Sequence, residues 1–380
     1  MPAKWEKLLE RWVAAGFIDA IAAQRIAAFE AQNQKNAGLR WPVLVAVSFG
    51  GVLLAAGVLL FVAAHWNELS PAWRFALLVL MLGGFHCVAA VVSPHFPELA
   101  KTLHAIGTIA LGAGIFLAGQ IFNLQEDWPL GLMLWALGAW LAWALLRDWV
   151  EATLAAILTP LWLAAEWLVF MDFARVSQLV LAESLLILAL TYLSARSDSL
   201  DTPPRRALAW LGGIALIPCV LAVFAAGESP FWGLPGTPTT TALAIGWVLG
   251  IALPLALAFL LRRRAGRSNL LAALWVVALG AMAHNVRTPY VWHELGLYLW
   301  CIVGSVGLVA WGLLERRSER INLGVAGFAL TVLVFYFSNV MDRIDRATSF
   351  IGLGVLFLAG GWMMERARRR LLTRVSRGLA

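Results

Sequence analysis

Polar side chains that could bind a solute or move a proton gather near one end of the long apolar segments of this chain. A polar group in or beside such a segment is costly unless it has a partner, so these positions are the first candidates for function. The candidates are His65, Asn67, Gln120, Asn123, Glu166, Glu183, His284, Asn285, Asn339 and Asp342. If they converge, they form one polar binding site, and otherwise each is a hydrated segment end.

Two of these candidates, Glu166 and Glu183, lie deeper inside consecutive apolar segments. Their similar depth predicts that the two carboxyl groups meet. Two carboxyl groups that share one proton can act as a proton relay. The alternative is that each carboxyl bonds to a neighbour, such as the side chain of Gln178 or Arg175.

Other chemistries lack the residues that they need. His86 and His104 also lie in apolar segments, but a metal site needs three or four converging ligands, and no pair of histidines has metalloprotease spacing. The three cysteines form no C-x-x-C pair. The sequence has no phosphate-binding loop, nucleophile elbow or dinucleotide fingerprint. We therefore predict no metal and no cofactor.

The composition defines the environment in which these residues work. Of 380 residues, 61% are apolar and 13% are charged, and the mean hydropathy is +0.79. Soluble domains are about half apolar and a quarter charged. A chain this apolar would expose an oily surface in water, so a soluble enzyme, a disordered protein and a secreted disulfide scaffold are excluded. The fold class that we predict is an all-α, polytopic bundle of membrane helices.

A membrane span needs about 20 mostly apolar residues, and unbroken runs of this length are helices rather than barrel strands. Twelve segments qualify: 43–64, 73–93, 102–122, 129–146, 151–171, 176–195, 207–226, 241–261, 269–283, 294–314, 321–338 and 347–364. Because the ninth segment is short and the fifth and sixth are close together, a count of ten or eleven spans is the alternative. Pro160, Pro218 and Pro254 interrupt three of the segments, and each frees a backbone carbonyl.

The basic residues predict the orientation. With twelve spans, 24 of the 29 Lys and Arg residues fall on the side that also receives both termini. That asymmetry places both termini in the cytoplasm. It also places the charge excess of +7 beside lipid head groups instead of on a nucleic-acid-binding face. We therefore expect membrane lipids as partners and no nucleic acid, with envelope proteins as further candidates and the oligomeric state open.

The chain outside the spans has its own pattern. Residues 1–41 are predicted to form a cytoplasmic amphipathic helical hairpin, in which Gly16 ends the first helix and Asp19 caps a second helix that continues to Phe29. Residues 42–365 then form the transmembrane bundle, and residues 366–380 form a basic cytoplasmic tail on the membrane surface.

Three short sequences in the first 150 residues resemble a known family. The sequence Trp-Val-Ala-Ala-Gly-Phe-Ile-Asp at residues 12–19, Phe-Val-Ala-Ala-His-Trp-Asn at residues 61–67 and Gly-Gln-Ile-Phe-Asn at residues 119–123 resemble the bacterial membrane-protein family known as domain of unknown function 2157. The likeness is clearest over the first 150 residues and returns at residues 335–365. His65 stands where the family has Asn, and Phe122 stands where Tyr is common.

The resemblance implies a polytopic protein of the bacterial inner membrane. It supplies no catalytic residues, because the family has no established activity. From the polar candidates we predict a transporter or flippase of a small or lipidic solute, with a polar site that faces the periplasm and protons as its drive. The alternatives are an enzyme at the outer leaflet, with His65 or His284 as acid–base group, and a non-catalytic subunit of an envelope complex.

Overall fold

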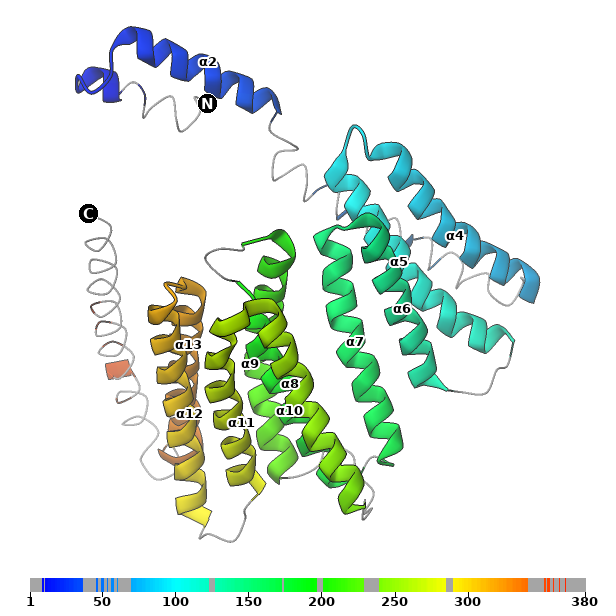
Figure 1. Cartoon of the computed structure of the whole chain (residues 1–380), viewed down its shortest axis with the longest axis vertical. Coiled ribbons are helices and arrows are strands. Elements are labelled where there is room, and N and C mark those ends of the chain that lie inside the picture. The colour runs from blue at the N-terminus through cyan, green and yellow to red at the C-terminus, as the bar shows by residue number, and fades with distance from the viewer. Residues whose placement is uncertain are drawn as a thin grey trace. The chain divides into compact units, whose positions relative to one another are not determined.

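The computed structural model describes residues 11–36, 70–122, 127–172, 174–196, 201–228, 239–284 and 290–340, together with isolated positions among residues 9–60 and 352–366. Every regular element in these ranges is helical (Figure 1). The chain divides into two compact units, Met1–Gln125 and Glu126–Ala380.

The first unit contains α2 (Ala20–Asn36), α4 (Pro71–Val92) and α5 (Pro97–Ile121). The second contains α6 (Trp128–Leu146), α7 (Trp149–Phe170), α8 (Arg175–Leu193), α9 (Pro203–Glu228), α10 (Thr240–Arg262), α11 (Arg267–His284), α12 (Tyr290–Leu314) and α13 (Ser318–Phe335). A 3-10 turn, η2 (Arg263–Gly266), joins α10 to α11, and a π-helical turn, η3 (Tyr336–Val340), follows α13.

Eight helical stretches in the described ranges are long and apolar enough to cross a membrane. They are Pro71–Val92, Pro97–Ile121, Trp128–Leu146, Trp149–Phe170, Pro203–Gly227, Thr240–His284, Leu295–Leu314 and Ser318–Ser338. The sixth stretch contains both α10 and α11, and α8 is a shorter apolar helix. The predicted all-helical membrane protein is therefore confirmed.

The predicted number of twelve spans is not established by these helices. Helices α4 to α13 coincide with the second to the eleventh predicted segments. The first and the last predicted segments lie mostly outside the described residues. The count of twelve therefore stays a prediction, as do the division at residues 41 and 365 and the basic tail.

Two local features of the N-terminal region agree with the sequence pattern. Gly16 has a positive φ of 73°, which glycine adopts readily at a helix end. The Asp19 carboxylate accepts a hydrogen bond from the backbone N–H of Ala22 at 2.6 Å and so caps α2. Helix α2 continues to Asn36, past the predicted end at Phe29. Most residues before Arg11 lie outside the described part, so the hairpin as a whole stays a prediction.

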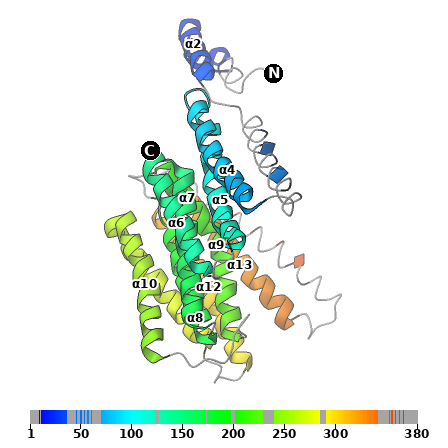
Figure 2. The ribbon, with the colours of Figure 1, turned by 90° about the vertical axis from the view of Figure 1, so that its right-hand side faces the viewer.

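In the first unit, α4 and α5 pack against each other along their length, as Figures 1 and 2 show from two directions. Both helices begin with a proline at the first turn, where the missing N–H costs nothing. A Ser70 hydroxyl caps α4 by accepting a hydrogen bond from the N–H of Trp73.

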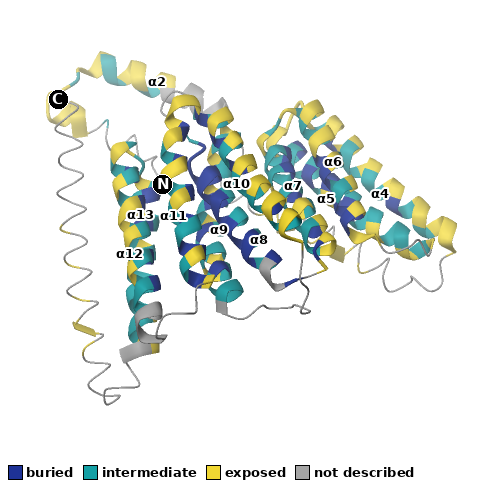
Figure 3. Ribbon diagram, turned by 60° about the horizontal axis from the view of Figure 1, so that its bottom comes forward, coloured by how far each residue is buried: buried dark blue, intermediate teal, exposed yellow. Residues whose placement is uncertain are grey.

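In the second unit, α8 is the central helix. It packs against α7, α9, α10 and α11, and Figure 3 shows it largely in the colour of buried residues. Its described side chains are buried or half-buried on all sides, which is typical of a helix that is enclosed by others. Gly212 of α9 lies so close to the Leu193 backbone that a Cβ there would overlap it, so the glycine permits this close helix contact.

The polar side chains of α8 are satisfied mostly by backbone carbonyls. Pro160 in α7 has no N–H, so the carbonyl of Ala156 one turn earlier has no donor within its own helix. The Tyr192 hydroxyl of α8 donates a hydrogen bond to that carbonyl at 2.8 Å. Thr191 donates to the Pro254 carbonyl of α10 at 3.3 Å. These bonds join α8 to α7 and α10 at positions where proline has disturbed the helix.

The bond between Tyr192 and Ala156 predicts a coupled pair of substitutions. Tyr192→Phe should lower the free energy of unfolding by about 1–2 kcal/mol, because the freed carbonyl loses its donor. In the background Pro160→Ala, the new alanine supplies an N–H to that carbonyl, so the same substitution should cost clearly less. Thermal unfolding of the four proteins in detergent gives the coupling energy. Equal costs in both backgrounds would contradict this account of the proline.

Candidate functional site

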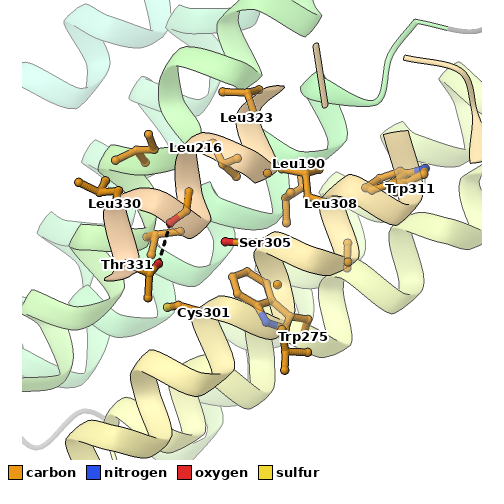
Figure 4. A pocket seen from close by; sticks show the side chains of 18 of the residues that line it. Leu190, Leu216, Trp275, Cys301, Ser305, Leu308, Trp311, Leu323, Leu330 and Thr331 are labelled. Atoms are coloured by element: carbon orange, nitrogen blue, oxygen red, sulfur yellow. Dashed lines mark hydrogen bonds between the residues drawn. The ribbon is translucent and has the colours of Figure 1, made fainter. Parts of the chain in front are cut away.

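The second unit contains an apolar groove with a volume of about 640 Å³ between α8, α9, α11, α12 and α13. Residues that line it include Leu190, Leu216, Trp275, Cys301, Ser305, Leu308, Trp311, Leu323, Leu330 and Thr331, all labelled in Figure 4. We refer to this cavity as the apolar groove.

The apolar groove has a buried floor and an open side. Leu190, Leu216 and Leu308 are buried, whereas Leu271 and Val303, which also line it, are exposed. Along α12 the lining extends from Leu297 to Leu314, which is about 25 Å at a helical rise of 1.5 Å per residue. The hydrocarbon core of a bilayer is about 30 Å thick. The groove therefore extends over most of the length of a membrane span.

Several polar atoms beside the groove are hydrogen-bonded within the protein. The indole N–H of Trp275 donates to the carbonyl of Trp300, and the indole N–H of Trp300 donates to the carbonyl of Trp275, both at 3.0 Å. The Thr331 hydroxyl donates to the Gly327 carbonyl at 2.8 Å (Figure 4). The surface left for a ligand is therefore mainly carbon, which favours an apolar chain.

One end of the groove borders a cluster of charged side chains, Arg262, Glu315, Arg320 and the indole of Trp311, which we call the arginine cluster. The Glu315 carboxylate accepts hydrogen bonds from Arg262 Nη2, from Arg320 Nη1 at 2.6 Å and from Trp311 Nε1 at 2.5 Å. The two guanidinium groups lie 5.3 and 4.8 Å from the centre of the Trp311 ring, within reach of cation–π attraction.

Hydrogen bonds between helix ends hold the arginine cluster in place. Arg262 Nη1 donates to Asn269 Oδ1 at 2.7 Å and to the Ser268 hydroxyl at 3.0 Å. The Asn269 amide donates in turn to the Ser194 hydroxyl at 2.9 Å. Arg196 pairs with Glu319 at 2.9 Å. The ends of α8, α10 and α12 and the starts of α11 and α13 therefore meet on one face of the unit.

We call this face the basic face. The connections at residues 196–206, 262–267 and 315–320 carry ten arginines and four acidic residues. That these connections share one side agrees with the alternation from which the orientation was predicted. The assignment of this side to the cytoplasm stays a prediction.

Charge interactions on the basic face set the ionisation of its carboxyl groups. Burial by itself raises the pKa of Glu315, but the charges of Arg320 and Arg262, with the hydrogen bonds from Arg320 and Trp311, outweigh burial and hold this pKa below its ordinary value. In the connection before α9, the hydrogen bond from Arg196 lowers the pKa of Asp201 to about 2. Both carboxyl groups are therefore ionised at neutral pH.

Glu183 of α8 has the opposite environment. Its side chain is 1% exposed, and neither carboxyl oxygen has a hydrogen-bond partner among the residues that the structure describes. It lies against the bare backbone of Gly280 in α11, where a Cβ would overlap the carboxyl group. A buried polar group without a partner costs stability, so Glu183 lowers the stability of the fold.

The predicted pair of Glu166 and Glu183 does not form in this structure. Glu166 is exposed on α7 and accepts a hydrogen bond from Trp162 Nε1 at 3.1 Å. Glu183 is buried and accepts none within the described part of the chain. The depths of the two carboxyl groups were similar, but the two helices turn them in different directions.

The other polar candidates are only partly described. Gln120 is exposed near the end of α5, in the first unit, and His284 is exposed at the end of α11, in the second. Asn339 belongs to the turn η3. The remaining candidates, His65, Asn67, Asn123, Asn285 and Asp342, lie outside the described residues. Their convergence on one polar site therefore stays a prediction.

The two histidines of the first unit do meet. His86 Nδ1 of α4 lies 2.8 Å from His104 Nδ1 of α5, with ring centres 5.1 Å apart. One ring donates its proton and the other accepts it, so at least one imidazole is neutral. Among the described residues no three His, Cys, Asp or Glu side chains lie close enough together to hold a metal ion.

The apolar groove and the arginine cluster were not anticipated from the sequence. From the sequence, Arg262 and Arg320 are interpreted as membrane-surface anchors, because sequence alone does not distinguish a buried guanidinium group from an exposed one. One signal was present: Glu315 is an isolated acid between an apolar helix and the basic run that contains Arg316 and Arg317.

Comparison with known proteins supports the assignment as a membrane protein. Residues 10–150 match the model of a family described as "Predicted membrane protein (DUF2157)", which confirms the resemblance noted in the sequence. Neither a curated protein nor a solved structure matches the chain. The chain is therefore a membrane protein that is similar, over residues 10–150, to a family whose description states no activity.

Substitutions of half-buried Glu315 and of buried Glu183 are predicted to have opposite effects on stability. Glu315→Gln should lower the free energy of unfolding by about 3 kcal/mol, because two buried guanidinium groups lose the carboxylate between them. Glu183→Met should leave it unchanged or raise it by about 1–3 kcal/mol, because an unpartnered polar group is removed. Thermal unfolding in detergent measures both. A loss of stability in Glu183→Met as large as that in Glu315→Gln would show that Glu183 is a structural residue.

Proposed function

We propose that this protein is a transporter or flippase of a lipidic solute in the bacterial inner membrane, with the basic face and both termini in the cytoplasm. The observation that carries the proposal is the apolar groove, which extends for about 25 Å along α12 from Leu297 to Leu314. A groove of this length has room for an apolar chain through most of one bilayer thickness.

The chemistry of the groove favours a lipidic solute over a small polar one. A site for a polar solute needs convergent polar groups that replace its water. The hydroxyl of Thr331 and the indole N–H of Trp275 are already bonded to backbone carbonyls. The exposed side chains on the open side, such as Leu271 and Val303, give a lipid in the bilayer a direct entry.

Glu183 is the group that we propose for coupling to protons. It lies seven residues before Leu190, so both side chains project from similar faces of α8, about 10 Å apart along its axis. Leu190 lines the groove. Because the Glu183 carboxyl is packed against Gly280 without a partner, a change in its charge would favour a different packing of α8 against α11, which forms a wall of the groove.

A groove-filling substitution tests the proposal. Gly307 lines the groove, and a Cβ added there would have no atom within 4 Å. Gly307→Phe should therefore fill the groove without disturbing α12. Gly83→Phe is the matched control, because Gly83 of α4 also has no atom within 4 Å of an added Cβ and belongs to the other unit.

The readout is the movement of a labelled lipid in vesicles that contain the purified full chain. Phosphatidylglycerol with a fluorescent nitrobenzoxadiazole label on one acyl chain is bleached by dithionite only in the outer leaflet. We expect the inner-leaflet label to become accessible at least about tenfold faster than in protein-free vesicles, a factor worth about 1.4 kcal/mol in activation free energy. Gly307→Phe should return the rate to background, and Gly83→Phe should not change it.

Two results would contradict the proposal. If the wild-type chain moves the lipid no faster than protein-free vesicles, with and without an imposed pH gradient, lipid transport is wrong. If instead the chain converts the labelled lipid to a product, the result would support the alternative hypothesis of an enzyme at the outer leaflet. Equal rates in the wild type and in Gly307→Phe would show that movement does not use the groove.

A further inference from the structure

We infer that the arginine cluster is a head-group site, so that the solute of the apolar groove is an anionic amphiphile. This inference rests on the proposed function, because it identifies the chemical class of the solute that the groove takes. Four observations support it: the unused donors of Arg320, the excess positive charge, the burial of that charge and its position at one end of the groove.

Arg320 presents an unused pair of donors. Arg320 is 0% exposed, and within the described part of the chain its side chain donates a hydrogen bond from Nη1 to Glu315 Oε2. Within the described part of the chain, its Nε and Nη2 atoms have no partner. The Nε–Nη2 edge of a guanidinium is a rigid fork that binds two oxygens of one carboxylate or phosphate group.

The charges of the cluster do not balance. Arg262 and Arg320 together carry two positive charges, and Glu315 supplies one negative charge between them. Glu319, the first acid of α13, also attracts Arg320, but it is itself paired with Arg196. Arg262 Nε also has no hydrogen-bond partner in the described ranges. A buried uncompensated charge is costly, and an anion bound beside Arg320 would neutralise it.

The cluster lies at the end of the groove. Trp311 lines the groove, and its ring is in contact with both guanidinium groups; it lies at one end of the lining residues in Figure 4. Ser268, which accepts a hydrogen bond from Arg262, lines the groove as well. Arg320 precedes the lining residue Gly324 by four positions and so lies on the same face of α13. Neither arginine lines the groove itself, so the head group of an apolar chain in the groove would reach them beside the Trp311 ring.

Two kinds of head group share this chemistry. The phosphate diester of a phospholipid and the carboxylate of a fatty acid each offer two oxygens to the Arg320 fork. The experiment therefore compares matched pairs of lipids that differ in head-group charge and not in their chains. One pair is dioleoyl phosphatidylglycerol and dioleoyl phosphatidylcholine, and the other is oleate and oleyl alcohol.

Binding is measured by native mass spectrometry of the full chain in neutral detergent. We expect the wild type to bind the anionic member of at least one pair about tenfold more tightly than the neutral member. Arg320→Lys keeps the charge and a bond to Glu315 but removes the fork, and it should lose most of this preference while it still binds the neutral lipid. The control is Arg264→Gln, because Arg264 is exposed on the same basic face; it should keep the preference.

A second measurement does not depend on the folding of Arg320→Lys. Because Glu315→Gln leaves two uncompensated arginines, the anionic lipid should raise the unfolding temperature of this variant more than that of the wild type, and the neutral lipid should not. Tight binding to phosphatidylglycerol alone would identify a phospholipid, and tight binding to oleate alone would identify a fatty acid.

The outcomes separate this inference from the proposed function. If the wild type binds both members of each pair equally, or if Arg264→Gln loses as much preference as Arg320→Lys, the head-group site is wrong and the groove proposal is unaffected. If no lipid binds and Gly307→Phe changes nothing, the groove proposal itself fails.

Discussion

The fold of the second unit depends on the enclosure of α8 by other helices. A helix in this position has no water to satisfy its polar groups, so each bond must come from a neighbouring helix or from its own backbone. Tyr192 and Thr191 donate to carbonyls of α7 and α10, and Ser194 accepts from Asn269 of α11. These bonds join α8 to α7, α10 and α11, and Leu190 of α8 lies on the buried side of the apolar groove.

The arginine cluster is the second constraint, and it acts at the end of the same helices. Buried guanidinium groups are tolerated there because Glu315 lies between them and the Trp311 ring lies against both. The resulting site is amphipathic along its length, with carbon surface beside α12 and excess positive charge at the basic face. That distribution of polarity matches a molecule with an apolar chain and an anionic head, which is why the groove and the cluster have one explanation.

The helices could be predicted from the sequence, and the site could not. Unbroken apolar runs require helices in a membrane, and the alternation of arginines required the connections 196–206, 262–267 and 315–320 to share a side, as they do. The rotation of each helix about its axis could not be predicted, because a segment that is apolar on all sides does not show which side faces the other helices. For that reason the depths of Glu166 and Glu183 suggested a carboxyl pair, although α7 turns one outward and α8 turns the other into the core.

The most direct test of the central claim is a density map of the full chain in nanodiscs of phosphatidylglycerol, at a resolution that shows side chains. The account predicts elongated lipid density in the groove along α12, with the phosphate at the Trp311 end and within hydrogen-bond distance of Arg320. A groove filled by the chain's own residues, such as the apolar segment at residues 347–364, would contradict it. Lipid density confined to the outer surface of the helices, with Arg320 bonded only to protein, would contradict it equally.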